Sequence, residues 1–212
     1  MDFNSFLTYI SKLKEIPLGG LDSQFKMAPE LRKKFSEIEI EKRKPKQSAV
    51  LALFYPDKEN ITNFLLMQRA NYNGVHAAQV SFPGGKKDSK DINLLQTALR
   101  ETEEEVGVSS NKIIVFKELT QTYIPPSNFI VTPYMGLVQK TPVFEINNEV
   151  EKLIEVNIKD LLDERSVSSK NLSTSYMQNI NVPCFKLNNY IVWGATAMML
   201  SEIKDILRRI NL

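Results

Sequence analysis

The sequence predicts one mixed α/β (α+β) domain preceded by an extension. Its 212 residues are the length of one ordinary domain with additional chain. Apolar residues make up 42% and charged residues 25%, a balance typical of a globular chain with a sizeable core. Short strand-like segments are interleaved with a few helical ones, which favours one layered structure of helices and a mixed sheet.

Residues 1–45 are expected to form a helical extension that packs on a domain formed by residues 46–212. Apolar residues recur there at helical spacing, at Phe3, Phe6, Leu7, Ile10 and Leu13. Pro17 and Gly19 end the pattern. Residues 32–46 hold seven basic and three acidic side chains. They are interpreted either as a solvated connector or as a basic approach to an anionic substrate.

The domain itself is expected to be rich in strands. Strands are predicted at residues 48–55, 64–69, 79–82, 113–123, 129–138, 180–187 and 190–193. A helix is predicted over 94–106, ended by Gly107, and an amphipathic helix closes the chain. The polar, serine-rich residues 166–175 predict a surface loop. No internal repeat is visible.

Composition excludes several kinds of site. The net charge is only +2, which does not indicate a nucleic-acid partner. A single cysteine, Cys184, excludes an internal disulfide and a multi-cysteine zinc cluster, and a single histidine, His76, excludes a site with several histidine ligands. A metal must therefore be held mainly by carboxylates, which favours Mg²⁺ or Mn²⁺.

No stretch approaches the roughly 18 apolar residues of a membrane span, and the first residues do not have the pattern of a secretory signal. We therefore expect a cytoplasmic protein with no membrane partner.

Residues 100–107 predict a helix with a carboxylate face. With about 100° per residue, Glu105 lies about 40° to one side of Glu101 and Glu104 about 60° to the other. Glu103 lies about 160° away and is expected to face solvent. Arg100 lies one turn before Glu104 and is expected to pair with it. Three converging carboxylates repel one another, and a divalent cation is the simplest compensation.

The stretch from Gly85 to Val108 resembles the Nudix box, Gly-x5-Glu-x7-Arg-Glu-U-x-Glu-Glu-x-Gly-U, where U is aliphatic. The matching residues are Arg100, Glu101, Glu104, Glu105, Gly107 and Val108. Asp91 stands where the motif has its first Glu, but eight residues, not seven, separate it from Arg100, and Thr102 replaces an aliphatic residue. The role of Asp88 or Asp91 is left open. The resemblance implies a Nudix-type α/β/α sandwich with a mixed sheet.

The upstream segment resembles the coenzyme A pyrophosphatase branch, Leu-Leu-Thr-x-Arg-Ser/Ala-x3-Arg-x3-Gly-x3-Phe-Pro-Gly-Gly. The matching residues are Leu65, Leu66, Arg69, Ala70, Phe82, Pro83, Gly84 and Gly85. Met67, Gly74 and Ala78 depart from it, and Gly74 removes a basic residue. The resemblance continues through residues 123–129 and 193–197. It implies a substrate site that includes Arg69, His76, Gln79, Gly84 and Gly85. His76 is interpreted either as a substrate contact or as an ordinary loop histidine.

The combined resemblance implies metal-dependent hydrolysis of a pyrophosphate bond. Glu101 and Glu105 would bind Mg²⁺ or Mn²⁺, with Glu104 as a further ligand or as the catalytic base, and Arg100 would orient the glutamates. Coenzyme A, as a nucleoside diphosphate derivative, would yield 3′,5′-ADP and 4′-phosphopantetheine.

Two alternatives to the coenzyme A reading remain. One is a Nudix enzyme for another nucleoside diphosphate, such as ADP-ribose or a dinucleotide. The other is a ligand-sensing module without catalysis. Free, acylated and oxidised coenzyme A are not distinguished by the sequence, nor are a monomer and a homodimer.

Overall fold

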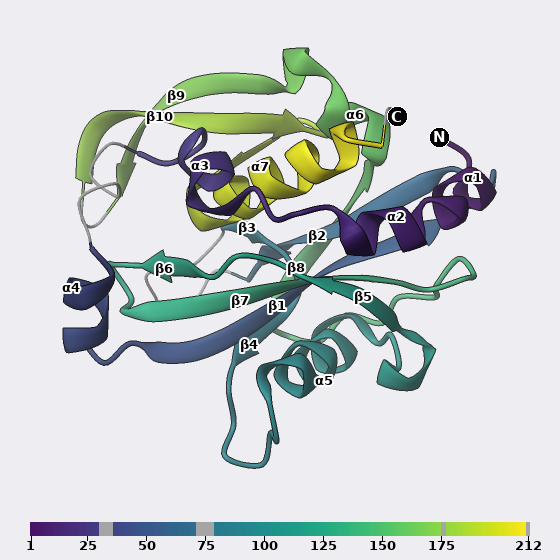
Figure 1. Ribbon diagram of the computed structural model, residues 1–212, viewed down its shortest axis with the longest axis horizontal. Helices are drawn as coiled ribbons and strands as arrows, with labels where there is room; N and C mark the ends of the chain where they lie inside the picture. Colours follow the sequence, from purple (N-terminus) through teal and green to yellow (C-terminus); the bar gives the residue numbers. More distant parts are fainter. Residues whose placement is uncertain (30–35, 71–78, 175–176, 211–212) are drawn as a thin grey trace.

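The computed structural model of the protein describes residues 1–29, 36–70, 79–174 and 177–210. A mixed sheet forms its centre (Figure 1). The path through this sheet is β3-β2-β1-β7-β5, with β4 and β6 paired to β1 and β7, and β8 paired to β2. The strands are β1 (Lys46–Pro56), β2 (Thr62–Arg69), β3 (Val80–Ser81), β4 (Gly84–Lys86), β5 (Ile114–Glu118), β6 (Thr122–Ile124), β7 (Phe129–Leu137) and β8 (Val150–Asn157).

The central strand β1 pairs parallel with β7 and antiparallel with β2 and β4. Its alternate side chains enter two different cores, because successive residues of a strand point to opposite faces. Ala49, Leu51 and Leu53 belong to the core on one face, whereas Ala52 and Phe54 belong to the core on the other. A strand buried on both faces explains why residues 48–55 are almost continuously apolar.

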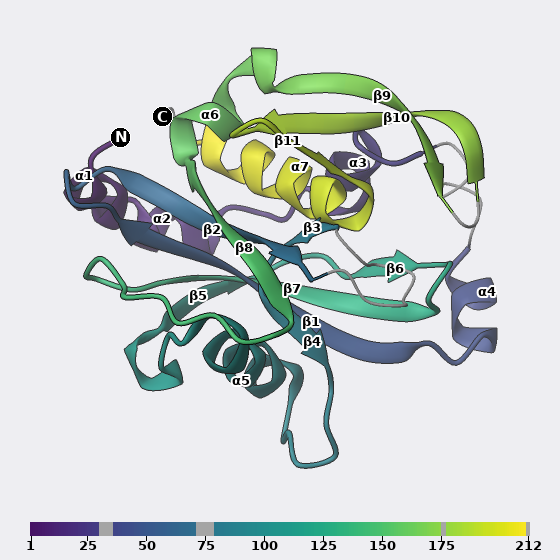
Figure 2. The ribbon, with the colours of Figure 1, turned by 180° about the vertical axis from the view of Figure 1, so that it is seen from behind.

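Helices cover both faces of the sheet (Figures 1 and 2). Helix α5 (Leu94–Val106) lies on one face, and α7 (Gly194–Arg208) lies on the other. Beside α7 are α1 (Phe3–Thr8), α2 (Ile10–Glu15), α3 (Gly20–Phe25) and α6 (Ile158–Leu162). This arrangement is the predicted α/β/α sandwich with a mixed sheet. No helix in the described part of the chain has the length and apolar character needed to cross a membrane.

Helix α5 begins and ends at the predicted residues. The Oδ1 atom of Asn93 accepts a hydrogen bond of 2.9 Å from the backbone N–H of Gln96, and so caps the first turn. Gly107 follows the last turn with φ +74°, a left-handed conformation that glycine adopts without strain. The residues that begin and end this helix are adjacent to it in sequence, and they fix where its carboxylates lie.

The first residues of the chain pack into the main core. Phe3, Phe6 and Leu13 are fully buried there. Their helical spacing predicts one helix, but the structure has two short ones separated at Tyr9. The division of the chain at residue 46 remains a prediction.

A buried carboxylate ties α3 to α7. Glu202 of α7 accepts hydrogen bonds from the backbone N–H of Gly20 and the side-chain amide of Gln24. It also accepts two from the backbone and hydroxyl of Thr120. Glu202 has no exposed surface. One side chain thus joins three segments that are distant in sequence.

The basic segment contains a short helix. Helix α4 (Glu37–Lys42) is closed at Ser36 by a capping box with Glu39, and it buries no residue. This part of the segment is therefore solvated, as one of the two interpretations expects. Residues 32–35 lie outside the described residues.

The prediction of a serine-rich loop over residues 166–175 is wrong. Residues Val167–Thr174 form β9, which pairs antiparallel with β10 (Met177–Leu187). With β11 (Tyr190–Trp193) they form a second, three-stranded sheet. Pairing with β10 satisfies the backbone hydrogen bonds of β9 whatever its side chains are, so a polar composition does not exclude a strand here. The strand predicted over 113–123 is likewise divided into β5 and β6.

Candidate active site

Helix α5 meets strand β4 at the two glycines, Gly84 and Gly85. The backbone N–H of Gly84 donates a 2.7 Å hydrogen bond to Glu105 Oε2. A Cβ atom at Gly85 would collide with the carboxylate of Glu101, and one at Gly84 would collide with the backbone of Ala49. Glycine is required at Gly84 because the backbone of the neighbouring strand approaches it so closely, whereas a side chain at Gly85 would displace the carboxylate of Glu101.

Glu105 is the most buried carboxylate of the helix, with 1% of its surface exposed. Burial raises its pKa to about 7, and repulsion from Glu101 and Glu149 adds to the rise. The hydrogen bond from the Gly84 N–H and the charge of the Arg69 guanidinium lower the pKa of Glu105 and so oppose this rise. Arg69 bridges two carboxylates, at 3.1 Å from Glu105 and 3.2 Å from Glu149.

Arg100 joins the other carboxylates. Its guanidinium lies 2.8 Å from Glu101 and 3.0 Å from Glu104, so the predicted pair with Glu104 is present. It also binds both oxygens of Asp91 at 2.9 Å. Asp91 is buried, and the hydrogen bonds from Arg100 hold the pKa of its carboxyl far below the usual range. Asp91 is thus a positioning residue for Arg100, a role that the shifted motif spacing left open.

The three helix carboxylates differ in their surroundings. Glu105 faces inward, Glu101 is half-buried and Glu104 is exposed. Glu103 points away, where it accepts a hydrogen bond from the Ser110 N–H. In the described part of the chain, no three Asp, Glu, His or Cys side chains lie close enough together to hold a metal ion. The guanidinium groups of Arg69 and Arg100 lie among these carboxylates.

The residues present nevertheless fit a hard divalent cation. The donors near Gly84 and Gly85 are carboxylate oxygens, the ligands that Mg²⁺ and Mn²⁺ prefer. Glu101, Glu104, Glu105 and Glu149 outnumber the two arginines that compensate them, and Arg100 also neutralises Asp91. Burial is the main cause of the raised pKa of Glu105 and Glu101, and repulsion from neighbouring carboxylates adds to it. Added positive charge would relieve that repulsion.

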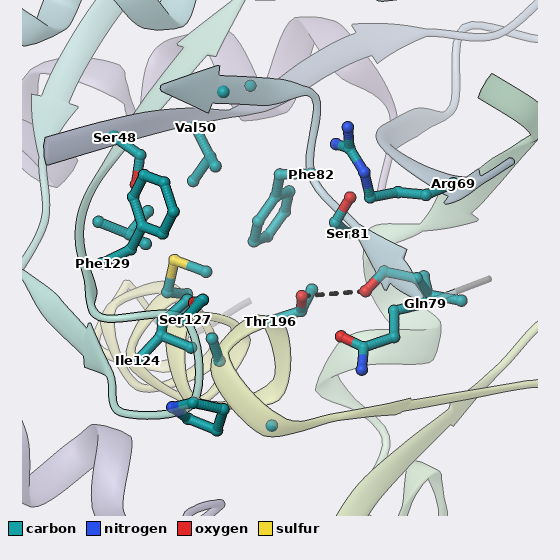
Figure 3. Close-up of a pocket in the computed structure, with 18 of the residues that line it drawn as sticks. Ser48, Val50, Arg69, Gln79, Ser81, Phe82, Ile124, Ser127, Phe129 and Thr196 are labelled. Carbon is teal, nitrogen blue, oxygen red and sulfur yellow. Dashed lines mark hydrogen bonds between the residues drawn. The ribbon is translucent and has the colours of Figure 1, made fainter. Parts of the chain in front are cut away.

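A cavity of about 430 Å³ opens beside Gly84 and Gly85 (Figure 3). Arg69, Gln79, Gly84 and Gly85 line it, so every predicted substrate residue in the described part of the chain lies at the cavity. His76 lies outside the described residues. Most of the wall is apolar and comes from three places: the segment around Phe82, the 124–131 segment and the start of α7.

Hydroxyl groups on the cavity wall were not anticipated from the sequence. Ser81 and Ser127 line the cavity, and among the described residues their buried Oγ atoms have no hydrogen-bond partner. Thr196, on the same wall, donates a 3.0 Å hydrogen bond to the carbonyl of Val80 (Figure 3). Single serines carry no motif, so only the folded arrangement reveals them.

The fold and this site define a hydrolase class. The family model of the NUDIX domain matches residues 45–174. The chain belongs to the Nudix hydrolase family. Its members cleave pyrophosphate bonds of nucleoside diphosphate derivatives and depend on divalent metal ions, and the enzyme described here is a pyrophosphohydrolase of this kind.

Individual relatives support the assignment to the Nudix family. The chain is 34% identical over 142 residues to the Nudix hydrolase NudL of Yersinia pestis (strain Pestoides F), covering 66% of this chain and 69% of the relative. NudL of Yersinia pseudotuberculosis (serotype O:1b) matches with the same identity and coverage. Among solved structures, the Nudix hydrolase RenU from M. smegmatis has a TM-score of 0.55 at 16% identity, covering 79% of this chain and 89% of RenU. A MutT/nudix family protein from Enterococcus faecalis has a TM-score of 0.51 at 14% identity, covering 98% and 70% of the two chains. These two structures support the fold.

Proposed function

We propose that the enzyme hydrolyses the pyrophosphate bond of coenzyme A, or of its acylated or oxidised forms. The products are 3′,5′-ADP and 4′-phosphopantetheine or its derivative. The observation that carries this proposal is the lining of the cavity. The three segments that resemble the coenzyme A branch, at residues 65–85, 123–129 and 193–197, all contribute described residues to its wall. They come together beside the carboxylates of α5.

The chain's own residues divide the chemistry among them. Glu101 and Glu105 would hold Mg²⁺ or Mn²⁺, with Glu104 as a further ligand or as the base that orients the attacking water. A divalent cation bound there supplies charge neutralisation of the diphosphate and lowers the pKa of the attacking water. Arg100 fixes Glu101 and Glu104, and Asp91 in turn fixes Arg100. Arg69 pairs with Glu105 and also lines the cavity, and we expect its guanidinium to bind a substrate phosphate.

The cavity wall suits the pantetheine arm. This arm is a slender chain with two amides and apolar links. Val50, Phe82 and Met199 offer apolar contact, while the hydroxyls of Ser81 and Ser127 are available for amide groups. An unsatisfied buried hydroxyl gains most from a ligand that can hydrogen-bond to it.

A second candidate is a Nudix pyrophosphatase for ADP-ribose or a dinucleotide. The observation in its favour is the pair of departures at Gly74 and Ala78, which remove a basic residue and a glycine from the upstream motif. A ligand-sensing role has less support, because all the helix glutamates of the motif are present. The proposal includes a cytoplasmic location and is compatible with a homodimer.

A product assay tests the proposal. Purified enzyme is given coenzyme A, dephospho-coenzyme A or ADP-ribose with Mg²⁺ or Mn²⁺, with and without a chelator. We expect 3′,5′-ADP from coenzyme A only when metal is present. Cleavage of ADP-ribose but not of coenzyme A would favour the second candidate, and cleavage of neither would contradict the coenzyme A proposal and the ADP-ribose form of the second candidate.

Variants test the residue roles in the same assay. Glu101→Gln and Glu105→Gln are expected to lower kcat by at least about 100-fold, in the range of an essential acid–base or ligand group. Glu103→Gln is the matched control, because Glu103 lies on the same helix but faces away from the cavity. Near-normal turnover by either of the first two variants would overturn the assignment.

A further inference from the structure

We propose that Lys46 and Lys86 form an anion subsite that binds a phosphomonoester on the nucleoside half of the substrate, apart from the scissile diphosphate. The inference rests on the proposed function and names residues that set its substrate preference. It concerns the end of the cavity opposite Arg69. In Figure 3 Ser48 and Phe129 lie at that end, and Arg69 and Gln79 lie at the other.

Strand pairing brings the two lysines to the cavity face. Lys86 is opposite Ser48, and Lys46 is opposite Phe129. Side chains two apart on a strand share a face, and so do paired residues on adjacent strands. Because Ser48, Phe129 and Lys86 line the cavity, Lys46 belongs to the same face. The Nζ atom of Lys46 lies 5.8 Å from the centre of the Phe129 ring, which places its charge at this end of the cavity.

The charge at this end is positive. A second hollow of about 370 Å³ adjoins the cavity at Lys86 and is lined by Lys46, Lys86 and Lys87. Its acidic members are Asp88 and Asp91, and Asp91 is already neutralised by Arg100. Among the described residues, none of the three lysines forms a salt bridge. Unpaired ammonium groups at the edge of a cavity attract an anionic ligand.

The spacing fits a nucleotide with an additional phosphate. Lys86 lies two residues along β4 from Gly84, whose backbone contacts the α5 carboxylates. Two strand residues span about 7 Å. This length is comparable with the separation of a 3′-phosphate from a 5′-diphosphate across one ribose. The Phe129 ring beside Lys46 offers a face for the base of the same nucleotide. The lysines thereby replace the basic residue that Gly74 removes from the upstream motif.

Kinetics on two substrates test the subsite. The double variant K46Q/K86Q is expected to raise KM for coenzyme A about tenfold and to leave kcat unchanged, as for the loss of two exposed charge contacts. KM for dephospho-coenzyme A, which lacks the 3′-phosphate, is expected to change less than about twofold. The matched control is K90Q/K112Q, which removes the same charge from exposed positions outside both hollows. Equal changes of KM for both substrates, or an equal effect of the control, would overturn the proposal.

A binding measurement separates this inference from the proposed function. Calorimetry compares 3′,5′-ADP with 5′-AMP, and neither requires turnover. The unchanged enzyme is expected to prefer 3′,5′-ADP, and K46Q/K86Q is expected to lose that preference. If coenzyme A is not cleaved but this preference is present and depends on the lysines, the proposed function fails and the subsite stands. If the preference is absent or survives in the variant, the subsite is overturned whatever the enzyme cleaves.

Discussion

Glu105 combines burial with an unfavourable charge environment. It lies in the sheet-facing side of α5, near two other carboxylates, and its compensation comes from one backbone N–H and from Arg69. Its raised pKa means that the folded state holds a proton more tightly than the unfolded chain. Without metal, the stability that this group contributes therefore falls as the pH rises from its ordinary value to about 7.

Glu105→Gln is expected to stabilise the metal-free protein above pH 7, because the amide keeps an acceptor for Gly84 and removes the buried charge. The gain is about 2 kcal/mol at pH 8, or about 5 °C in Tm, and shrinks toward pH 5. Thermal unfolding with a chelator at both pH values measures it. Glu103→Gln is the control and should show no such trend. A variant that is less stable than the native protein at pH 8 would contradict the electrostatic argument.

At the scale of elements, α5 and β4 act as one unit. The helix carries the carboxylates, and the two glycines of the strand allow them to contact its backbone. The helix must also end at Gly107, because the backbone at this position lies close to Glu145. A side chain at this position meets both an unfavourable φ and a steric contact, since a Cβ would lie 2.9 Å from that of Glu145.

Gly107→Ala is expected to destabilise the protein by about 2 kcal/mol, through left-handed strain and the contact with Glu145 together. Gly20→Ala separates the two effects. Gly20 has a similar φ of +64°, but a Cβ there meets nothing within 4 Å. Its expected loss is about 1 kcal/mol. Denaturant unfolding of both variants gives the comparison. Equal losses would mean that Glu145 moves aside without penalty.

At the scale of the whole molecule, Glu202 joins α3, the segment after β5 and α7. Both of its oxygens accept hydrogen bonds. Because the side chain is fully buried, the donors around it cannot bond to solvent water instead. The stability of the N-terminal helices is therefore coupled to the last helix.

Glu202→Gln is expected to lower Tm by about 5 °C or more, because the amide nitrogen cannot accept the hydrogen bonds that one carboxylate oxygen now receives. The loss is about 2 kcal/mol. Glu151→Gln, at an exposed position of β8, is the control and should change Tm little. Thermal unfolding at neutral pH measures both, and an unchanged Tm in the Glu202 variant would contradict the coupling.

Prediction from the sequence succeeded where the signals are local. The end of α5 follows from Gly107, which is adjacent to the helix in sequence. The pair of Arg100 and Glu104 follows from helical spacing. The partners of Arg69 do not, because both are far from it in sequence: Glu149 meets it through the pairing of β2 with β8, and Glu105 through the contact of α5 with β4. The sequence does not predict β8, and it predicts a loop where β9 forms, because each of these strands is defined by a distant partner strand.

The contacts of Glu202 also bear on the order in which the protein is synthesised. A ribosome makes residues 1–28 long before residues 194–210, yet Phe3, Phe6 and Leu13 are buried in a core that α7 completes. During translation these apolar side chains and the Gln24 amide have no α7 to pack against until most of the chain has emerged. The nascent protein therefore exposes these side chains for longer than the apolar residues of α7, and they are available for longer to chaperones that recognise apolar segments.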